Sequence, residues 1–204
     1  MRRTDFLKNN SFYFLRLGAV YHINPRFNIG AGAGHLWLAN RSGATELFTN
    51  ENRMYQHAQL SHVFGNIRLQ QRLRIEERWQ QRVVNFRPTN EYRYSTRYRY
   101  QLYLTIPVSK NEYVPSIAIA DELLLQSGKD IAYNTFDQNR LFTGIRQQIT
   151  PSLSFDAGYM LVYQQRLNGF QYNRNHTFRL FFYWQPDLRK KKSTSTAHPI
   201  LPEE

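Results

Sequence analysis

Arginine is the residue type with the most chemical potential in this chain. The stretch from Arg68 to Arg82, RLQQRLRIEERWQQR, contains five arginines and two glutamates. Guanidinium groups hold carboxylates and phosphates through parallel hydrogen bonds, so such a stretch could bind anions, pair with acidic side chains or contact nucleic acid. The whole chain has 27 Lys+Arg against 15 Asp+Glu and a net charge of +12. This balance fits a nucleic-acid binder, a surface facing anionic lipid or lipopolysaccharide, or an anion-binding cavity.

A hydrolytic site is the other chemistry to consider, and its best candidate is His176. Ser127, Asp130 and Asp137 lie on or beside one long connection and would have to complete a Ser/His/acid set. No nucleophile motif accompanies them, and the sequence has no HExxH, P-loop or dinucleotide-binding signature. The chain also has no cysteine, which excludes disulfides and cysteine-based metal sites. We therefore expect a protein with no catalytic residues, no cofactor and no metal.

The elements that carry the arginines follow a period of two. Between Ile67 and Val83 the odd positions are mostly apolar, whereas the even positions are all polar. A helical period would place Glu76 and Gln80 on the apolar face, so alternation fits better and predicts a long two-faced strand. Glu77 is the one charged residue on its apolar face. The same alternation recurs and predicts nine strands, at 11–23, 27–38, 53–64, 67–83, 91–107, 113–126, 138–149, 153–165 and 173–185.

The connections between these strands alternate in length. Four are tight and rich in turn formers, at 24–26, 65–66, 109–112 and 150–152. Four are longer and polar, at 40–51, 85–91, 127–137 and 166–172. This rhythm predicts an all-β, antiparallel, up-and-down β-barrel with tight turns at one end and larger loops at the other. The GAGAG stretch at 30–34 lies within a strand and indicates a small-residue face where the barrel tapers or a plug side chain packs, and not a phosphate loop.

Periodicity does not decide which face lies inside. A soluble barrel or sandwich would bury the apolar faces, whereas a transmembrane barrel turns them toward lipid. Several predicted strands reach 12 to 17 residues, longer than the about 5–6 of soluble strands and sufficient for the about 9–11 of a spanning strand. Aromatic residues stand near strand ends, as in the two girdles of membrane barrels: Tyr21, Trp37, Trp79, Tyr92, Tyr163 and Trp184. We therefore predict a transmembrane barrel, with outer-membrane lipid and lipopolysaccharide as partners.

In such a barrel the polar faces line the lumen. The residues expected there are Arg68, Arg72, Arg74, Glu76, Arg78, Arg97, Arg99, Glu122, Arg140, Arg146, Asp156 and Arg179. One interpretation is a ladder of ion pairs that fills the lumen. A second, based on the surplus of arginine, is an anion or small-solute channel, and a third is an outer-membrane enzyme acting on lipid or peptide. Arginine and tyrosine alternate to opposite faces in EYRYSTRYRY (91–100), which argues against a nucleic-acid groove.

Three stretches carry a resemblance: RLQQRLRIEERW, ADELLLQSGKDIAYNTFDQNRLFTGIRQQITPSLSFDAGYML and NRNHTFRLFFYW. Together they resemble the bacterial outer-membrane barrels grouped as domain-of-unknown-function family 2490, over residues 11 to 185. The family pattern maps onto Gln71, Arg72, Arg74, Glu76 and Arg78, onto Asp121 and Glu122, onto Asn139, Arg140 and Gly144, and onto Gly158 and Tyr159. The resemblance implies an outer-membrane location and no established activity. Asp121 and Glu122 point to opposite faces of a regular strand, so only one of them can face the lumen.

The strand count predicts an incomplete barrel. Nine is odd, whereas bacterial single-chain barrels have an even number of strands, so we expect a tenth strand and a signal peptide upstream. Residues 1–10 are then the remnant of an extracellular loop, 11–185 the barrel, and 186–204 a flexible periplasmic tail. The last strand ends in Phe182 and Trp184, aromatic residues that the barrel-insertion machinery would read. The sequence leaves the oligomeric state open.

Overall fold

The computed structural model describes residues 2–4, 9–42, 45–111, 113–131, 135–166 and 168–184. All regular elements within them are β-strands: β1 (Arg2–Thr4), β2 (Asn9–His22), β3 (Phe27–Ser42), β4 (Thr45–Phe64), β5 (Ile67–Val84), β6 (Arg87–Pro107), β7 (Ser116–Ser127), β8 (Phe136–Thr150), β9 (Leu153–Gln165) and β10 (Tyr172–Trp184). No helix that could cross a membrane occurs in this part of the chain. The segment 186–204, predicted to be a tail, lies outside the described residues.

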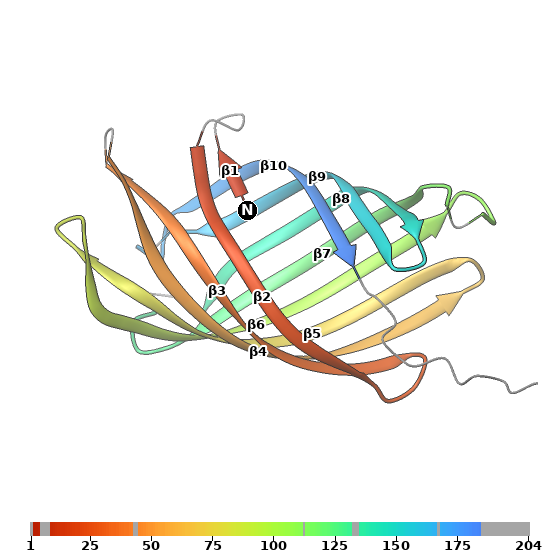
Figure 1. The fold of residues 1–204 in the computed structure, drawn as a ribbon, viewed down its shortest axis with the longest axis horizontal. Helices are drawn as coiled ribbons and strands as arrows, with labels where there is room; N and C mark the ends of the chain where they lie inside the picture. The colour runs from red at the N-terminus through yellow and green to blue at the C-terminus, as the bar shows by residue number, and fades with distance from the viewer. Residues whose placement is uncertain are drawn as a thin grey trace, which may run out of the picture.

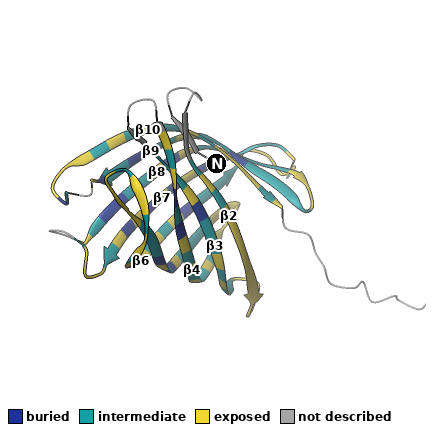
Figure 2. Ribbon diagram, turned by 60° about the vertical axis from the view of Figure 1, so that its left-hand side comes forward, coloured by how far each residue is buried: buried dark blue, intermediate teal, exposed yellow. Residues whose placement is uncertain are grey.

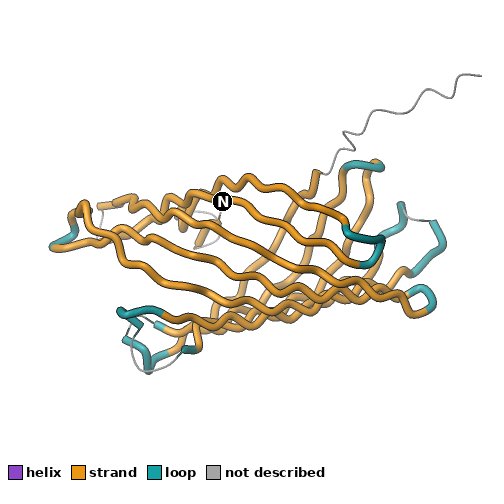
Figure 3. Tube along the Cα trace, turned by 90° about the horizontal axis from the view of Figure 1, so that it is seen from below, coloured by secondary structure: helices purple, strands orange, loops and turns teal. Residues whose placement is uncertain are grey.

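The strands form one antiparallel sheet in sequence order, from β1 to β10. Figures 1 and 3 show this sheet curled about itself into a half-barrel, with hairpins joining consecutive strands. Nine of the strands have 12 to 21 residues, and each contains most of one predicted strand. The prediction of an all-β, up-and-down antiparallel sheet is therefore confirmed. The exception is β1, three residues within the segment 1–10 that pair with β2.

Two of the four predicted long loops are absent. The connection expected at 85–91 is a two-residue turn at Asn85 and Phe86, with φ angles of 49° and 56°. Two positive φ angles in a two-residue hairpin match a type I′ turn, which follows the right-handed twist of its strands. The connection expected at 40–51 is also mostly strand, because Ser42 pairs with Thr45. The longer connections between described strands are 108–115 between β6 and β7, 128–135 between β7 and β8, and 166–171 between β9 and β10. The predicted tight turn at 109–112 is therefore wrong, and so is the regular alternation of short and long connections, because the three connections from β3 to β6 are all short.

The two faces of the sheet are inverted relative to a soluble protein. Buried residues include Glu51, Arg74, Glu76, Arg78, Arg97, Glu122 and Asp156, each at most 6% exposed. Large apolar residues with more than half of their surface exposed include Leu15, Leu17, Tyr21, Met54, Leu73, Phe178 and Trp184. In Figure 2 buried and exposed residues alternate along the strands. The curl therefore encloses a charged inner face and presents an apolar outer face. A small cluster of Tyr103, Ala118, Ala120 and Phe142, with Met160 against it, is also buried.

The glycines near the start of the chain make room for two rings. Tyr55 and His57 on β4 lie over the inner face of β2 and β3, where a Cβ atom on Gly18 or Gly32 would overlap the Tyr55 hydroxyl. A Cβ atom on Gly30 would overlap the His57 ring in the same way. Only glycine lets the rings approach the backbone this closely. The GAGAG stretch is thus a small-residue face against which other side chains pack, as its composition predicts.

The two ends of the sheet leave edges open. Among the described residues no ladder joins β10 to β1 or β2. Phe181 on β10 and Val20 on β2 follow the phase of the inner face, yet 52% and 53% of their surfaces are exposed. The inner face is therefore uncovered along the seam between β2 and β10, where Figure 1 shows the sheet ends approaching each other.

Candidate functional site

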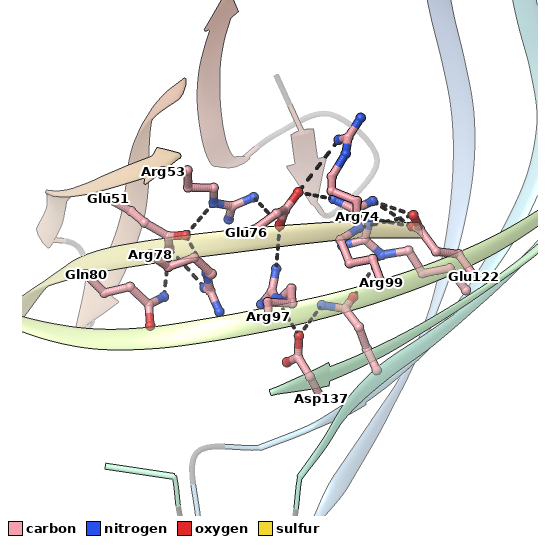
Figure 4. Close-up of polar contacts among 12 residues, drawn as sticks. Glu51, Arg53, Arg74, Glu76, Arg78, Gln80, Arg97, Arg99, Glu122 and Asp137 are labelled. Atoms are coloured by element: carbon pink, nitrogen blue, oxygen red, sulfur yellow. Dashed lines mark hydrogen bonds and ion pairs between the residues drawn. The ribbon is translucent and has the colours of Figure 1, made fainter. Parts of the chain in front are cut away.

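Within the part of the chain that the structure describes, five carboxylates lie buried on the inner face, one on each of five strands. They are Glu51, Glu76, Glu122, Asp137 and Asp156, exposed by 0–5%. Because strand residues alternate between faces, Arg74 and Arg78 share the face of Glu76. Among the described residues, nine arginines place a nitrogen within 4.0 Å of an oxygen of one of these five carboxylates: Arg53, Arg72, Arg74, Arg78, Arg97, Arg99, Arg140, Arg146 and Arg179. We call these fourteen residues the arginine–carboxylate network; Figure 4 shows much of it.

Glu51 holds one end of the network. Arg78 grips it with two hydrogen bonds, from Nε to Oε1 at 2.7 Å and from Nη2 to Oε2 at 3.1 Å. Gln80 Nε2 donates to Oε2 at 2.7 Å, and Arg53 Nε donates to Oε1 at 2.5 Å. Four donors thus surround a carboxylate that has no exposed surface. Such bonds replace the lost water and offset the cost of burying a charge.

Arg99 joins two carboxylates at the centre of the network. Its Nη1 donates to Glu76 Oε1 at 2.6 Å, and its Nη2 donates to Glu122 Oε1 and Oε2 at 2.6 and 2.7 Å. Three further arginines lie 3.7–4.0 Å from Glu76: Arg53, Arg74 and Arg97. Glu76 is therefore enclosed by four guanidinium groups from β4, β5 and β6 (Figure 4).

The network continues across β7 and β8. Arg72 and Arg140 approach Glu122 at 3.4 and 3.5 Å, and Arg97 Nε lies 2.7 Å from Asp137 Oδ2. Five neighbouring strands, β4 to β8, are thereby tied together through side chains as well as through their ladders. An interior tied in this way has little freedom to open without breaking several charged contacts.

Asp156 on β9 is the centre of a second part of the network. It is fully buried, and the Tyr183 hydroxyl donates to its Oδ2 at 2.9 Å. Arg179 and Arg146 each approach Asp156 at 3.4 Å. The contacts join β8, β9 and β10 on the same inner face.

The network contains nine arginines but only five carboxylates. Some of these arginines contact aromatic rings. The Arg179 guanidinium lies 4.5 Å from the centroid of the Phe142 ring. Arg74 lies 4.7 Å from the Tyr55 ring, and the same ring also receives Arg16 at 5.4 Å. Cation–π contacts of this kind partly replace hydration for a buried guanidinium.

Eleven of the twelve residues expected on the lumen face belong to this network. The exception is Arg68, which is exposed beside the turn at Gly65 and Asn66. That end of β5 extends past the packed interior, so a residue of the right phase there meets solvent. Of the Asp121–Glu122 pair, Glu122 faces inward. Asp121 is exposed on the outer face and accepts a hydrogen bond from Asn139 Nδ2 at 2.6 Å.

Three members of the network escape the sequence prediction: Glu51, Arg53 and Asp137. Glu51 lies in a segment that reads as a loop, because both faces of β4 there are polar. Arg53 starts the most weakly patterned predicted strand, and Asp137 was assigned to a connection. The sequence does contain one signal that could have found the first two of them. Glu51, Arg53 and Tyr55 are alternate residues, so they share one face of a strand, and this face is the inner one.

The predicted interface aromatics are on the outer face and lie toward strand ends. Tyr21 and Trp184 are 69% and 73% exposed at the tight-turn ends of β2 and β10. Trp37 and Tyr92 are also exposed. The Trp79 ring lies 5.5 Å from the Tyr94 ring, and the Tyr163 ring stacks on the Tyr172 ring at 5.0 Å.

The polar residues that interrupt the outer face of β5 mostly find partners there. Gln71 accepts from the Tyr100 hydroxyl at 2.8 Å, and Gln81 accepts from the main-chain nitrogen of Asn50 at 3.1 Å. Glu77 is exposed, opposite Met54 in the ladder. Two of the three polar residues on this face, Gln71 and Gln81, are therefore hydrogen-bonded.

The candidate hydrolytic residues are not brought together. His176 is exposed on the outer face of β10, and its Nδ1 lies 2.6 Å from the Tyr159 hydroxyl. Asp137 is buried with Arg97 on the opposite face of the sheet, while Asp130 pairs with Arg82 at 2.8 Å. A proton relay needs direct contact or one intervening water, so this geometry does not support the catalytic interpretation.

An up-and-down sheet with a charged, paired inner face and an apolar outer face defines the class to which this chain belongs, an all-β half-barrel with inverted polarity. The family model described as a protein of unknown function (DUF2490) matches residues 1–176. The chain therefore belongs to domain-of-unknown-function family 2490, as the resemblance in its sequence indicates. No curated protein and no solved structure matches the chain.

Proposed function

We propose that this protein is a transmembrane β-barrel of the bacterial outer membrane with no enzymatic activity. The inverted polarity of the sheet carries the proposal. Charged residues such as Glu51, Glu76 and Asp156 are at most 3% exposed, whereas Leu17, Phe178 and Trp184 are at least 73% exposed. In water, so large an apolar surface would favour aggregation, and in a bilayer it is the surface that lipid solvates.

The height of the apolar face supports the proposal. On the outer face of β5, the stretch from Leu69 to Trp79 is apolar except at Gln71 and Glu77. At about 3.3 Å per residue and a strand tilt of about 40°, those ten steps span roughly 25 Å along the membrane normal. This matches the apolar band of outer-membrane barrels. The exposed aromatics toward strand ends would then lie at the two interfaces, with Tyr21 and Trp184 at one of them.

A closed barrel follows from the same setting, because an unpaired sheet edge is costly in lipid. β2 and β10 run in the same direction, since both are even-numbered strands of one antiparallel meander. A single antiparallel strand between them would complete a ten-stranded barrel and cover Phe181 and Val20. The strand β1 already occupies this place over Arg2–Thr4.

We propose that the arginine–carboxylate network fills the interior of this barrel, which makes the protein an envelope component with a closed lumen. Barrels of this size have interiors just wide enough for side chains. The second candidate is an anion or small-solute channel, and the observation that favours it is the excess of nine network arginines over five carboxylates.

Localisation tests the proposal. The protein is expressed behind a secretion signal in a Gram-negative bacterium, and membranes are separated by density. We expect it in the outer-membrane fraction, resistant to urea extraction, with a gel mobility that changes on boiling. Recovery as a soluble periplasmic protein, or a mobility unaffected by heat, would overturn the architecture.

A further inference from the structure

We propose that the loop end of the inner face contains a binding site for a small solute that carries an oxyanion, either a phosphate or a carboxylate. The site is a cavity of about 400 Å³ between the ends of β5 and β6, the end of β7 and the connection from β9 to β10. Its volume falls within the range of small-molecule sites. It lies beyond the part of the network centred on Arg99, at the end of the strands opposite the turns at 24–26, 65–66 and 150–152.

The charge of the cavity wall points to an anion. Four arginines line it, Arg78, Arg93, Arg97 and Arg166, but one carboxylate, Asp137. Arg97 Nε lies 2.7 Å from Asp137 Oδ2, and Arg78 donates hydrogen bonds to Glu51, so both guanidinium groups already have a carboxylate partner. The positive charge available to a ligand is therefore that of Arg93 and Arg166.

The hydrogen bonds of these two arginines are with neutral groups, and the Asp130 carboxylate near Arg93 is already paired with Arg82 at 2.8 Å. Arg93 Nη2 donates to the main-chain oxygen of Asp130 at 2.6 Å. Arg93 Nε is buried and has no hydrogen-bond acceptor among the described residues. Arg166 donates to Asn173 Oδ1 at 2.6 Å and to Gln171 Oε1 at 3.2 Å. A guanidinium normally takes a carboxylate or phosphate in such a place, and two of them facing one cavity suit an oxyanion.

The rest of the wall suits the uncharged part of a polar solute. The side-chain amides of Gln80, Gln126, Gln164 and Gln165 line the cavity, and each amide offers both donors and an acceptor. Gln126 and Gln165 are linked at 3.4 Å, and Gln165 also donates to the main-chain oxygen of Gly169 at 2.7 Å. The amides of Gln126 and Gln165 are thereby held in place before a ligand arrives. These amides can form hydrogen bonds with hydroxyl groups of a ligand but not with an apolar group. A solute of the size of a sugar that carries a phosphate or a carboxylate therefore fits the site.

The inference does not rest on the membrane location, because the cavity belongs to the folded sheet and is open to test in detergent. The experiment is titration calorimetry on the detergent-folded protein, with glucose 6-phosphate as the anionic probe, glucose as its neutral match, and inorganic phosphate. Lipid A in mixed micelles, added as a competitor, distinguishes a lipid phosphate from a free solute. We expect saturable binding of glucose 6-phosphate and none of glucose.

Substitutions assign the binding to the cavity. Arg93→Gln combined with Arg166→Gln should weaken the binding of glucose 6-phosphate by at least about tenfold, since charge-assisted hydrogen bonds are lost. Arg68→Gln replaces an exposed arginine at the other end of β5; it removes one positive charge away from the cavity and should leave the affinity unchanged. Far-UV circular dichroism verifies that each variant retains its β-sheet. Absence of saturation below about 10 mM, or an equal loss in Arg68→Gln, would overturn the site.

Discussion

Glu76 and Glu77 are adjacent residues of one type on opposite faces of β5, so they allow a matched test of the polarity of the sheet. The perturbation is Glu76→Gln compared with Glu77→Gln, each of which removes one negative charge while nearly preserving shape. Glu76 is 3% exposed and has Arg99 at 2.6 Å and three more arginines at 3.7–4.0 Å. Glu77 is exposed, opposite Met54 and Thr96.

The expected magnitudes differ several-fold. Breaking a buried ion pair from one side leaves uncompensated charge and costs about 3–5 kcal/mol. Because four guanidinium groups surround Glu76, we expect Glu76→Gln to reach that range. Exposed substitutions away from special features stay within about 0.5 kcal/mol, and we expect this for Glu77→Gln. Only the inner substitution should therefore lower the unfolding midpoint strongly.

The assay is equilibrium urea unfolding of each protein in detergent micelles, followed by tryptophan fluorescence and by the loss of heat-modifiable migration. An unchanged slope with a lowered midpoint would show that stability, not the extent of unfolding, has changed. A double-mutant cycle with Arg99→Gln should give a coupling free energy of about 0.5–3 kcal/mol. The reasoning is refuted if Glu77→Gln destabilises the protein as much as Glu76→Gln does.

Three further predictions concern the turn, the glycine face and the interior. Phe86→Gly should stabilise the protein by about 1 kcal/mol in the same unfolding assay, since Phe86 has a φ of 56° and glycine adopts that angle without strain; destabilisation would contradict the turn geometry. Gly32→Val should destabilise by at least about 1–3 kcal/mol, because its Cβ would overlap the Leu17 carbonyl and the Tyr55 hydroxyl; an unchanged midpoint would exclude that packing. In planar bilayers we expect no steady conductance, whereas anion-selective current that falls in Arg97→Gln would support the channel candidate instead.

Much of the fold can be predicted from the sequence, because a strand with one apolar and one polar face alternates between apolar and polar residues. The alternation from Ile67 to Val83 and the tight turn at Gly65 and Asn66 place β5 to within a residue or two of its bounds. The same phase assigns Arg74, Glu76 and Arg78 to one face. Which strands lie side by side then follows from the short connections.

The rest depends on contacts that periodicity does not encode. Glu51 was missed because Asn50 and Asn52 make the outer face of β4 polar as well, and a segment polar on both faces reads as a loop. The turn at Phe86 was missed because a bulky residue rarely adopts a positive φ. The pairing of Arg99 with both Glu76 and Glu122 depends on the register of three strands, which no local pattern contains.

The central claim is that the apolar outer face contacts lipid. The three tryptophans report on it directly, because Trp37, Trp79 and Trp184 all lie on that face, with Trp184 73% exposed. The measurement is quenching of tryptophan fluorescence in proteoliposomes by lipids brominated at different depths and by aqueous iodide. We predict strong quenching by brominated lipid, greatest for bromines near the headgroups, and weak quenching by iodide. Strong iodide quenching with no effect of brominated lipid would contradict the account.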